Sequence, residues 1–370
     1  ELRAEFEQVK GNTKKLKEFH SKLATLKFLD PACGCGNFLV IAYREIRLLE
    51  IDILRALLTK EGSTQLTTNV LDFGVLCDVD QFYGIEIEEF PAQIAQTALW
   101  LMDHQMNMLV SSEFGGYFVR LPLVKSATII YGNALQKDWQ EVVNPTELNY
   151  ILGNPPFIGK RYQNAVQKAD LARVFHDLPK AGLLDFVSAW YRKATNIKTA
   201  FVSTNSITQG EQASVLWPDL LQRGVRIHFA HRTFQWSSEA SGRAAVHCVI
   251  IGFALHDTTD KHIFDYETPQ AEAHEVKVKN INPYLVDASD IVLKSRQEPL
   301  SNALPIAFGS MPNDGGYLLL SSEEKANLIE LDPNSIRWIR RLFGSNEFIN
   351  NKELWCLWLV NISPNELRSM

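Results

Sequence analysis

Short apolar segments alternate with longer segments of helical periodicity through roughly the first two thirds of this 370-residue chain, and this alternation most constrains its fold. In segment 37–58, for example, apolar residues recur at the spacing of one helix face. Strands that alternate with helices form a parallel or mostly parallel sheet with helices on both faces. We therefore expect an α/β fold. Strands are expected at 25–30, 81–87, 126–135, 148–154, 198–204, 225–231 and 244–255, and further helices at 91–107 and 183–195.

The first predicted strand runs into the glycine-containing segment Asp30–Phe38, DPACGCGNF. Ligands of such sheets bind at the carboxyl ends of the strands, and Gly34 and Gly36 allow a ligand to approach the backbone closely. The segment lacks the third glycine of a dinucleotide fingerprint, because position 39 is leucine. A carboxylate at Asp30 would oppose a phosphate and favour an ammonium. A cationic, phosphate-free cofactor fits these residues, and S-adenosylmethionine carries both an amino group and a sulfonium. The alternative is a glycine loop that binds no ligand.

Polar residues also end the second and third predicted strands. Glu86 lies where an acidic side chain accepts hydrogen bonds from both hydroxyls of a ribose. Its separation from the glycines is much longer than the usual gap of about 20 residues. The alternative is one of three glutamates on a solvated turn. Asn133 ends the third strand and is a candidate contact for an adenine ring, or a plain turn asparagine.

The fourth predicted strand ends in Asn154-Pro155-Pro156-Phe157. The amide oxygen of Asn154 and the carbonyl of Pro155 would accept the two N–H groups of a planar amine. This pulls electron density onto the nitrogen and prepares it to attack a methyl group. The prolines fix the backbone, and the Phe157 ring offers a stacking face worth about 1–3 kcal/mol for one base. The sequence therefore predicts methyl transfer to a planar amine, with a structural proline loop as the alternative.

The charge and cysteine content limit the class of protein. No apolar run approaches the roughly 20 residues of a membrane span, so we expect no membrane contact. The five cysteines show no paired metal spacing, and we expect no metal and a reducing, cytoplasmic setting. The first residue is Glu1, so we expect a fragment or a processed chain.

The net charge of −6 means that any basic surface for nucleic acid must be local. Two clusters are candidates, with ordinary solvated charges as the alternative for each. One comprises Arg223, Arg226, Arg232 and Arg243 with His228 and His231, and the other comprises Arg337, Arg340 and Arg341 beside Trp338.

Together these segments resemble a known family. DPACGCGNF resembles the cofactor loop, and NPPF the catalytic loop, of N6-adenine DNA methyltransferases that use S-adenosylmethionine. The cofactor loop comes first, as in the gamma group, whose target recognition lies at the carboxyl terminus. The segments FQWSSEASGRAAVHCVIIGF, MPNDGGYLLLS and GSNEFINNKELWCLWL are similar to the MmeI-like single-chain restriction-modification enzymes.

The resemblance implies a Rossmann-like methyltransferase domain at 1–258 and a smaller α+β segment at 259–370 that forms part of a target-recognition domain. It implies double-stranded DNA as the partner, with any nuclease or helical segments outside this fragment. Asn154, Pro155, Pro156 and Phe157 would hold the target adenine, and Phe234 or Trp236 would provide its second aromatic face. The cofactor site would comprise Asp30, Pro31, Ala32, Gly34, Gly36, Asn37, Phe38, Glu86, Ile87, Asn133 and Ala134.

Two rival functions stay open. One is an N5-glutamine protein methyltransferase, which uses a similar Asn-Pro-Pro-aromatic loop on a planar amide but usually ends it in tyrosine. The other is a non-catalytic module of a restriction or defence system that binds DNA or cofactor without turnover. The sequence favours the DNA methyltransferase, because segment 154–157 is intact and a C-terminal extension follows it.

Overall fold

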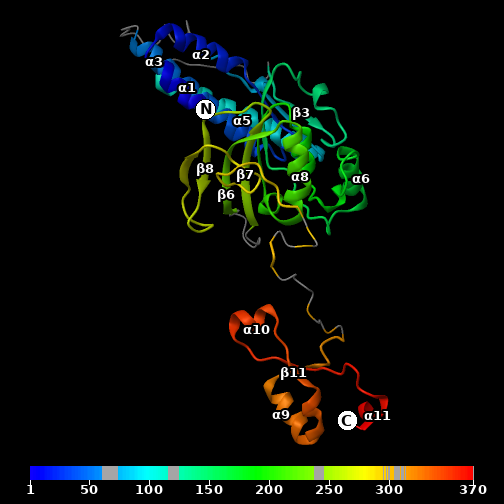
Figure 1. Cartoon of the computed structure of the whole chain (residues 1–370). Coiled ribbons are helices and arrows are strands. Elements are labelled where there is room, and N and C mark those ends of the chain that lie inside the picture. Colours follow the sequence, from blue (N-terminus) through cyan, green and yellow to red (C-terminus); the bar gives the residue numbers. More distant parts are fainter. Residues whose placement is uncertain are drawn as a thin grey trace. The chain divides into compact units, whose positions relative to one another are not determined.

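The computed structural model describes two compact units, Glu1–Ser295 and Arg296–Met370 (Figure 1). The described residues are 1–60, 74–115, 125–236, 246–294, 296, 298, 301–303, 309, 312 and 314–369. The functional boundary predicted at 258/259 stays a prediction, because compactness divides the chain by packing and not by function. Among the described residues, no helix combines the length and apolar character that a bilayer crossing requires.

The first unit is built on a nine-stranded sheet of order β3-β2-β1-β4-β5-β7-β6-β8-β9. Strands β3, β2, β1, β4 and β5 run parallel, and β7 is antiparallel to both β5 and β6. The predicted mostly parallel α/β sheet is therefore confirmed. The strands are β1 (Lys27–Asp30), β2 (Phe82–Glu86), β3 (Thr128–Tyr131), β4 (Leu148–Gly153), β5 (Lys198–Thr204), β6 (Arg226–Trp236), β7 (Val246–Ala254), β8 (Lys261–Asp265) and β9 (His274–Val278).

Segment 256–280 contains a peripheral hairpin. Strands β8 and β9 pair antiparallel, and β8 adds to β6 at the end of the large sheet. The buried Lys261 ammonium fixes this hairpin, since it contacts Asp257 at 2.8 Å and Asn280 at 2.9 Å. A buried ammonium is stable only when it is paired in this way.

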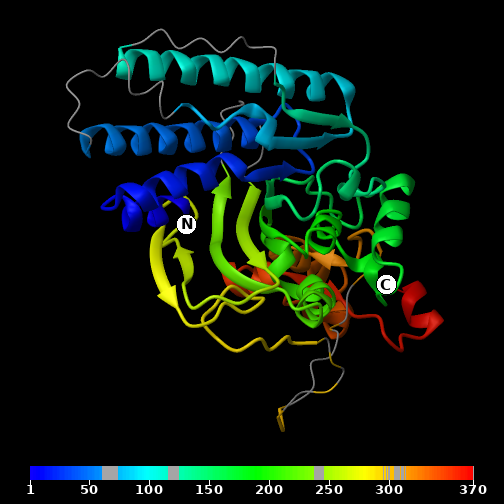
Figure 2. The ribbon, with the colours of Figure 1, turned by 90° about the horizontal axis from the view of Figure 1, so that it is seen from above.

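Helices cover both faces of the sheet. They are α1 (Leu2–Val9), α2 (Thr13–Thr25), α3 (Asn37–Lys60), α5 (Glu89–Phe114), α6 (Ala165–Val174), α7 (Ser188–Lys193) and α8 (Gly210–Gln222). Short 3-10 turns lie at η1 (Val79–Gln81), η2 (Trp139–Glu141), η3 (Ala181–Leu183) and η4 (Asn205–Thr208). Figure 2 shows the blue and cyan helices α2, α3 and α5 grouped on one side of the sheet.

Two buried clusters hold these layers together. On one face Leu16, Leu49 and Leu99 of α2, α3 and α5 pack against Phe28 and Phe82 of the sheet. On the other face Leu171, Trp190 and Trp217 of α6, α7 and α8 pack against the strands. Each fully buried side chain of this size contributes about 1.5–3 kcal/mol, so both helical layers are fixed by apolar burial.

A buried polar network ties the helices of the first face to one another. The Arg47 guanidinium, fully buried on α3, contacts Asp103 of α5 at 2.8 Å and Glu50 at 3.2 Å. Glu50 Oε1 in turn accepts a hydrogen bond from His20 Nε2 of α2 at 3.0 Å. Removal of one partner of such a buried pair costs about 3–5 kcal/mol, so this network specifies how α2, α3 and α5 meet.

The predicted single helix at 183–195 is wrong in its first half. The structure has the turn η3, then an extended Leu184, and α7 begins only at Ser188. The reason is tertiary, because the backbone N–H groups of Asp185 and Phe186 donate to Gln212 Oε1 and Ile158 O, both at 2.9 Å. These bonds replace the intrahelical ones.

The second unit is smaller and mixes helices with a three-stranded sheet of order β10-β12-β11. Its strands are β10 (Leu319–Leu320), β11 (Ile339–Arg341) and β12 (Trp355–Leu357). Its helices are α9 (Ser322–Leu331), α10 (Ser345–Asn350) and α11 (Pro364–Ser369), with a 3-10 helix η5 (Pro333–Trp338). The capping box of Ser321 and Glu324 starts α9. The expected α+β composition of this segment is confirmed.

Candidate functional site

One pocket of the first unit lies where the parallel strands end. Its volume is about 420 Å³, within the range of roughly 300–1,000 Å³ that is usual for small-ligand sites. The loops after β1, β2, β3 and β4 form most of its wall, and α6 and α7 close it. It is lined by Pro31, Ala32, Ile85, Glu86, Ile87, Gly132, Asn133, Ala134, Asn154, Pro156, Ile158, Asn164, Val166, Gln167, Asp170, Phe186 and Trp190.

The glycine loop after β1 is held against α5. Gly34 and Gly36 have φ of 54° and 85°, a left-handed backbone that glycine adopts without steric cost. A Cβ on Gly36 would lie 2.9 Å from the Cβ of Ala95 on α5, which is too close. Asn37 and Phe38 begin α3 directly after this turn. Both glycines are therefore required by the backbone, although neither lines the pocket.

Asp30 is buried behind the same loop. It is 1% exposed, and its Oδ1 accepts a hydrogen bond from the Ala32 N–H at 3.0 Å. Burial raises the pKa of Asp30, the Ala32 N–H lowers it and the nearby Glu86 carboxylate raises it, and the net result is a pKa of about 7. A Cβ on Gly153 of the neighbouring strand would lie 2.4 Å from Asp30 Oδ1. The carboxyl of β1 therefore packs directly on the backbone of β4.

Glu86 connects the glycine loop to the pocket. Its Oε2 accepts a hydrogen bond from the Gly34 N–H at 2.8 Å, and its Oε1 accepts one from the Glu88 N–H at 3.0 Å. Each carboxylate oxygen retains a further lone pair. Ile87, the next residue, is 61% exposed and lines the pocket. The predicted ribose contact of Glu86 is compatible with these bonds and stays a prediction.

Asn133 lies in the pocket wall with both ends of its amide engaged. Its Nδ2 donates to Asp170 Oδ2 at 2.7 Å, and its Oδ1 accepts from the Leu135 N–H at 2.9 Å. Asp170 is 2% exposed on α6, and its Oδ1 accepts a second amide hydrogen from Gln136 at 2.8 Å. The sequence reasoning missed Asp170, because nothing in segment 165–174 marks its carboxylate as part of a site more than thirty residues earlier.

Lys193 of α7 stabilises the loop that follows β3. Its ammonium donates to the carbonyls of Ala134 and Lys137 at 2.7 and 2.6 Å. Burial lowers the pKa of Lys193 to about 8. The Trp139 indole donates to Ala134 O at 2.8 Å as well. The loop after β3 is therefore fixed by side chains from two distant elements.

Asn154 differs from the other polar residues at the strand ends. Its Oδ1 is buried and has no hydrogen-bond partner among the described residues. Buried side-chain oxygens are nearly always paired, and an unpaired one costs about 1–3 kcal/mol. Pro155 is buried, Pro156 is exposed at the pocket wall, and Phe157 is half-buried against the core. Asn154 is therefore a pocket-lining residue whose Oδ1 is left without a partner by the described part of the chain.

Segment 184–190 braces the loop that follows Asn154. Asp185 Oδ1 accepts from the Lys160 N–H at 3.1 Å, and Gln163 Nε2 donates to Leu184 O at 3.0 Å. The Trp190 indole donates to Pro31 O at 3.1 Å, which links the same segment to the glycine loop. The local pattern of this segment predicts a plain helix and gives no sign that it braces the loop after Asn154.

The charge of the pocket lining bears on the ligand. Of the described residues that line it, none is Lys, Arg or His, and two are acidic, Glu86 and Asp170. Two carboxylates in the lining favour a ligand with positive charge and amine donors over a phosphate. The lining thus fits S-adenosylmethionine, as the glycine loop predicts. No group of three or more metal-ligating side chains occurs within the described ranges.

The two aromatic candidates lie outside this lining. Phe234 stacks on Tyr266 with ring centroids 5.5 Å apart, and its centroid lies 6.1 Å from that of Trp236. Trp236 is 37% exposed at the end of β6. The pairing of either ring with a target base stays a prediction.

The predicted basic clusters are partly neutralised. Arg223 pairs with Asp177 and Asp219, and Arg232 pairs with Asp265 at 2.8 Å. In the second unit Arg337 pairs with Glu366 at 3.2 Å. Arg243 lies outside the described residues. Exposed pairs of this kind are worth little to stability, so these arginines can exchange partners at small cost.

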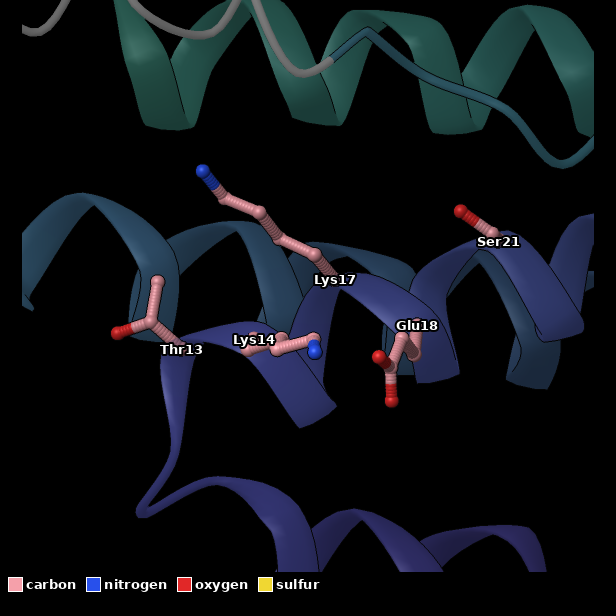
Figure 3. Close-up of a pocket in the computed structure, with 5 residues that line it drawn as sticks. All are labelled: Thr13, Lys14, Lys17, Glu18 and Ser21. Carbon is pink, nitrogen blue, oxygen red and sulfur yellow. The ribbon is translucent and has the colours of Figure 1, made fainter.

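A second depression lies on α2 and is lined by Thr13, Lys14, Lys17, Glu18 and Ser21 (Figure 3). Its volume is about 660 Å³. All five residues come from one helix, and Lys17 and Glu18 project away from each other. No set of groups converges there, so the pocket at the strand ends is the candidate site.

Comparisons with known proteins indicate a single family. The family model for the DNA-methyltransferase domain of MmeI matches residues 6–265, and that for the MmeI target recognition domain matches residues 287–370. DNA methyltransferase A of Bacillus subtilis (strain 168) is 39% identical over 365 residues, covering 96% of this chain and 40% of that protein.

A solved structure, the Type IIL restriction-modification enzyme MmeI in complex with DNA, matches with a TM-score of 0.87 at 54% identity. The match covers 100% of this chain and 50% of that one. This chain therefore spans half or less of the length of these two relatives.

Proposed function

This chain belongs to the MmeI family of DNA methyltransferases, and from that premise we propose that it methylates adenine at N6 in double-stranded DNA. The observation that carries the proposal is the buried, unpaired Oδ1 of Asn154 at the pocket wall. A planar amine satisfies such an acceptor, and among the exocyclic amines of DNA we select that of adenine because Asn154–Phe157 resembles the catalytic loop of the N6-adenine class.

The cofactor of this reaction is S-adenosylmethionine, which when bound would supply an electrophilic methyl group on its sulfonium. Asp30 and the glycine loop would face its cationic amino-acid part, with Pro31, Ala32, Gly34, Gly36, Asn37 and Phe38 around it. Glu86 and Ile87 would hold the ribose, and Asn133 and Ala134 the adenine ring. The acidic, cation-free lining of the pocket supports this arrangement.

The target amine would be held by two acceptors. Asn154 Oδ1 takes one N–H and the Pro155 carbonyl takes the other, which raises the electron density on nitrogen as it becomes tetrahedral. Because the amine loses its proton after transfer, no side chain with a shifted pKa is needed as a base. The contribution of the chain is mainly positioning, which agrees with the rigid prolines and with the braced loop beyond them.

Adenine inside a duplex cannot reach Asn154, so the base must leave the stack. Unstacking costs a few kcal/mol, and a stacking face for the flipped base returns about 1–3 kcal/mol. Phe157 would provide one face, and Phe234 or Trp236 the other. Residues 259–370 would carry part of the sequence recognition. MmeI itself is described as a restriction-modification enzyme bound to DNA, and we propose the modification role for this chain.

The test uses the whole chain, radiolabelled S-adenosylmethionine and unmethylated genomic DNA. We expect label in N6-methyladenine, and about 10²–10³-fold slower transfer by Asn154→Ala, the range for loss of one group that stabilises a transition state. Asn196→Ala removes an exposed asparagine on the turn before β5 and is the matched control. Label in protein glutamine would support the rival methyltransferase. Cofactor binding without transfer to DNA would support the non-catalytic module.

A further inference from the structure

The turn that follows the catalytic segment exposes a large aromatic ring. Residues Gly159–Tyr162 form a β-turn, closed by a hydrogen bond from the Tyr162 N–H to Gly159 O at 2.8 Å. Tyr162 is 85% exposed, whereas the next residue, Gln163, is 6% exposed. The chain therefore places an unburied ring directly beside a buried anchor.

Hydrogen bonds hold the residues on both sides of this ring. On one side of Tyr162 the Lys160 N–H donates to Asp185 Oδ1 at 3.1 Å. On the other side Gln163 Nε2 donates to Leu184 O at 3.0 Å and to Ile158 O at 3.3 Å. Asp185 is itself fixed, because its Oδ2 accepts from Ser206 at 2.9 Å. A ring held in water by a braced turn gains no burial from the fold, which points to a ligand.

The turn stands at the rim of the candidate active site. Ile158 precedes it and Asn164 follows it, and both residues line the pocket. Tyr162 lies between them in sequence and projects into solvent. Tyr162 therefore belongs to the chain segment that connects two pocket-lining residues.

The neighbours of the ring suit nucleic acid. Lys160 and the exposed Arg161 immediately precede Tyr162. The Lys160 ammonium lies 3.4 Å from Glu211, an exposed ion pair that phosphate can replace at small cost. Cations for the backbone and an aromatic ring for the bases are the two components of nucleic-acid binding.

We propose that Tyr162 enters the DNA duplex as the target base leaves it and stacks in the vacated space, while Lys160 and Arg161 contact the flanking phosphates. This inference rests on the proposed function and adds to it the residue that offsets the cost of unstacking. Proteins that distort duplexes commonly insert an apolar side chain between base steps. The braced turn presents the ring in advance, so little conformational entropy is lost on insertion.

The experiment compares two duplexes. The target sequence is first mapped from genomic DNA methylated by the wild-type chain. Single-turnover transfer is then measured on a paired duplex of that sequence, and on a duplex with an abasic site opposite the target adenine. An unpaired target base is cheaper to extrude. The variants are Tyr162→Ala, Tyr162→Phe and Leu101→Ala, which truncates a 60%-exposed side chain on α5.

We expect Tyr162→Ala to slow transfer to the paired duplex by about 10- to 100-fold, the range of one lost base stack. The abasic duplex should restore it to within about threefold of the wild type, because extrusion no longer limits the rate. Tyr162→Phe and Leu101→Ala should resemble the wild type, and all variants should bind S-adenosylhomocysteine equally.

Equal slowing on both duplexes would overturn the insertion, since a surface contact does not depend on the pairing of the target. No slowing on either duplex would overturn any role of the ring in DNA binding. A wild-type chain that binds cofactor and labels no DNA would instead reject the proposed function itself, so the two failures are distinguishable.

Discussion

Asp30 and Asn154 lie at the ends of the neighbouring parallel strands β1 and β4. Their side chains differ in whether they have a hydrogen-bond partner within the fold. The Asp30 carboxyl is buried and bonded to its own loop through the Ala32 N–H. The Asn154 amide oxygen is buried and has no partner in the described part of the chain. A buried charge without partners costs far more than a neutral acceptor. The fold therefore gives the carboxyl one internal partner and gives the amide oxygen none among the described residues.

Asn154→Ala should have the largest effect, and it tests whether the Asn154 oxygen is unpaired in the fold. We expect methyl transfer to fall by about 10²–10³-fold. The free energy of unfolding should stay the same or rise slightly, because the variant deletes an unsatisfied buried acceptor. Single-turnover transfer and thermal unfolding of the same preparations measure both. A large loss of stability would mean that Asn154 is bonded in the folded chain and that its oxygen is not open.

Gly153→Ala tests the contact between the two strand ends. A Cβ there would lie 2.4 Å from Asp30 Oδ1, so either the carboxyl or the strand must move. We expect a destabilisation of about 1–3 kcal/mol, as for other overpacked cores, and weaker cofactor binding. Gly182→Ala is the control, because a Cβ at that position meets nothing within 4 Å. Equal unfolding midpoints for both variants in urea would contradict the packing of Asp30 on β4.

Asp170→Asn extends the comparison to the end of β3. There the Asn133 amide donates to Asp170 and accepts from the Leu135 N–H, and Asp170 also accepts from Gln136 Nε2. An amide at position 170 offers one acceptor oxygen to two donors, so one donor is left unpaired at a cost of about 1–2 kcal/mol. We expect an unfolding loss of that size with weaker binding of S-adenosylhomocysteine by calorimetry. An unchanged affinity would show that the orientation of Asn133 does not matter to the cofactor.

The pH dependence of cofactor binding tests the Asp30 carboxyl directly. The folded pKa of Asp30 is about 7 against an ordinary 3.8, so the folded chain binds more protons between these values. Stability of the ligand-free chain should therefore fall as pH rises from about 4 to 7. Affinity for a cationic cofactor should rise over the same range, by at most about tenfold per pH unit. Asp30→Asn should flatten both curves, and an unaltered slope would assign the dependence to another group.

Local patterns predicted most of the sheet and the polar residue at each strand end. Glu86, Asn133 and Asn154 all line the pocket, as their positions after β2, β3 and β4 predicted. This succeeds because parallel strands bring their carboxyl ends to one edge, so sequence order alone gathers these residues. The prediction of a helix over 183–195 failed in its first half, because the backbone N–H groups of Asp185 and Phe186 donate to Gln212 Oε1 and Ile158 O instead of to helical carbonyls.

Three side chains that hold the pocket loops in place could not be predicted from the local sequence. Asp170, Asp185 and Trp190 come from segments whose local patterns look like ordinary helix. Their partners are Asn133, Lys160 N–H and Pro31 O, and the Trp190 bond joins residues 159 positions apart. Long-range pairs leave no periodic trace in the chain.

The local sequence predicts which functional group follows each strand, because strand alternation and the Asn154–Phe157 segment are local properties of the chain. Which of those groups lack an internal hydrogen-bond partner depends on the tertiary packing. The Asp30 carboxyl is enclosed by Ala32 and Gly153, and the Asn154 oxygen is left unpaired. Whether a polar group binds the fold or a ligand depends on which distant atoms pack around it, and packing is fixed by the whole molecule at once.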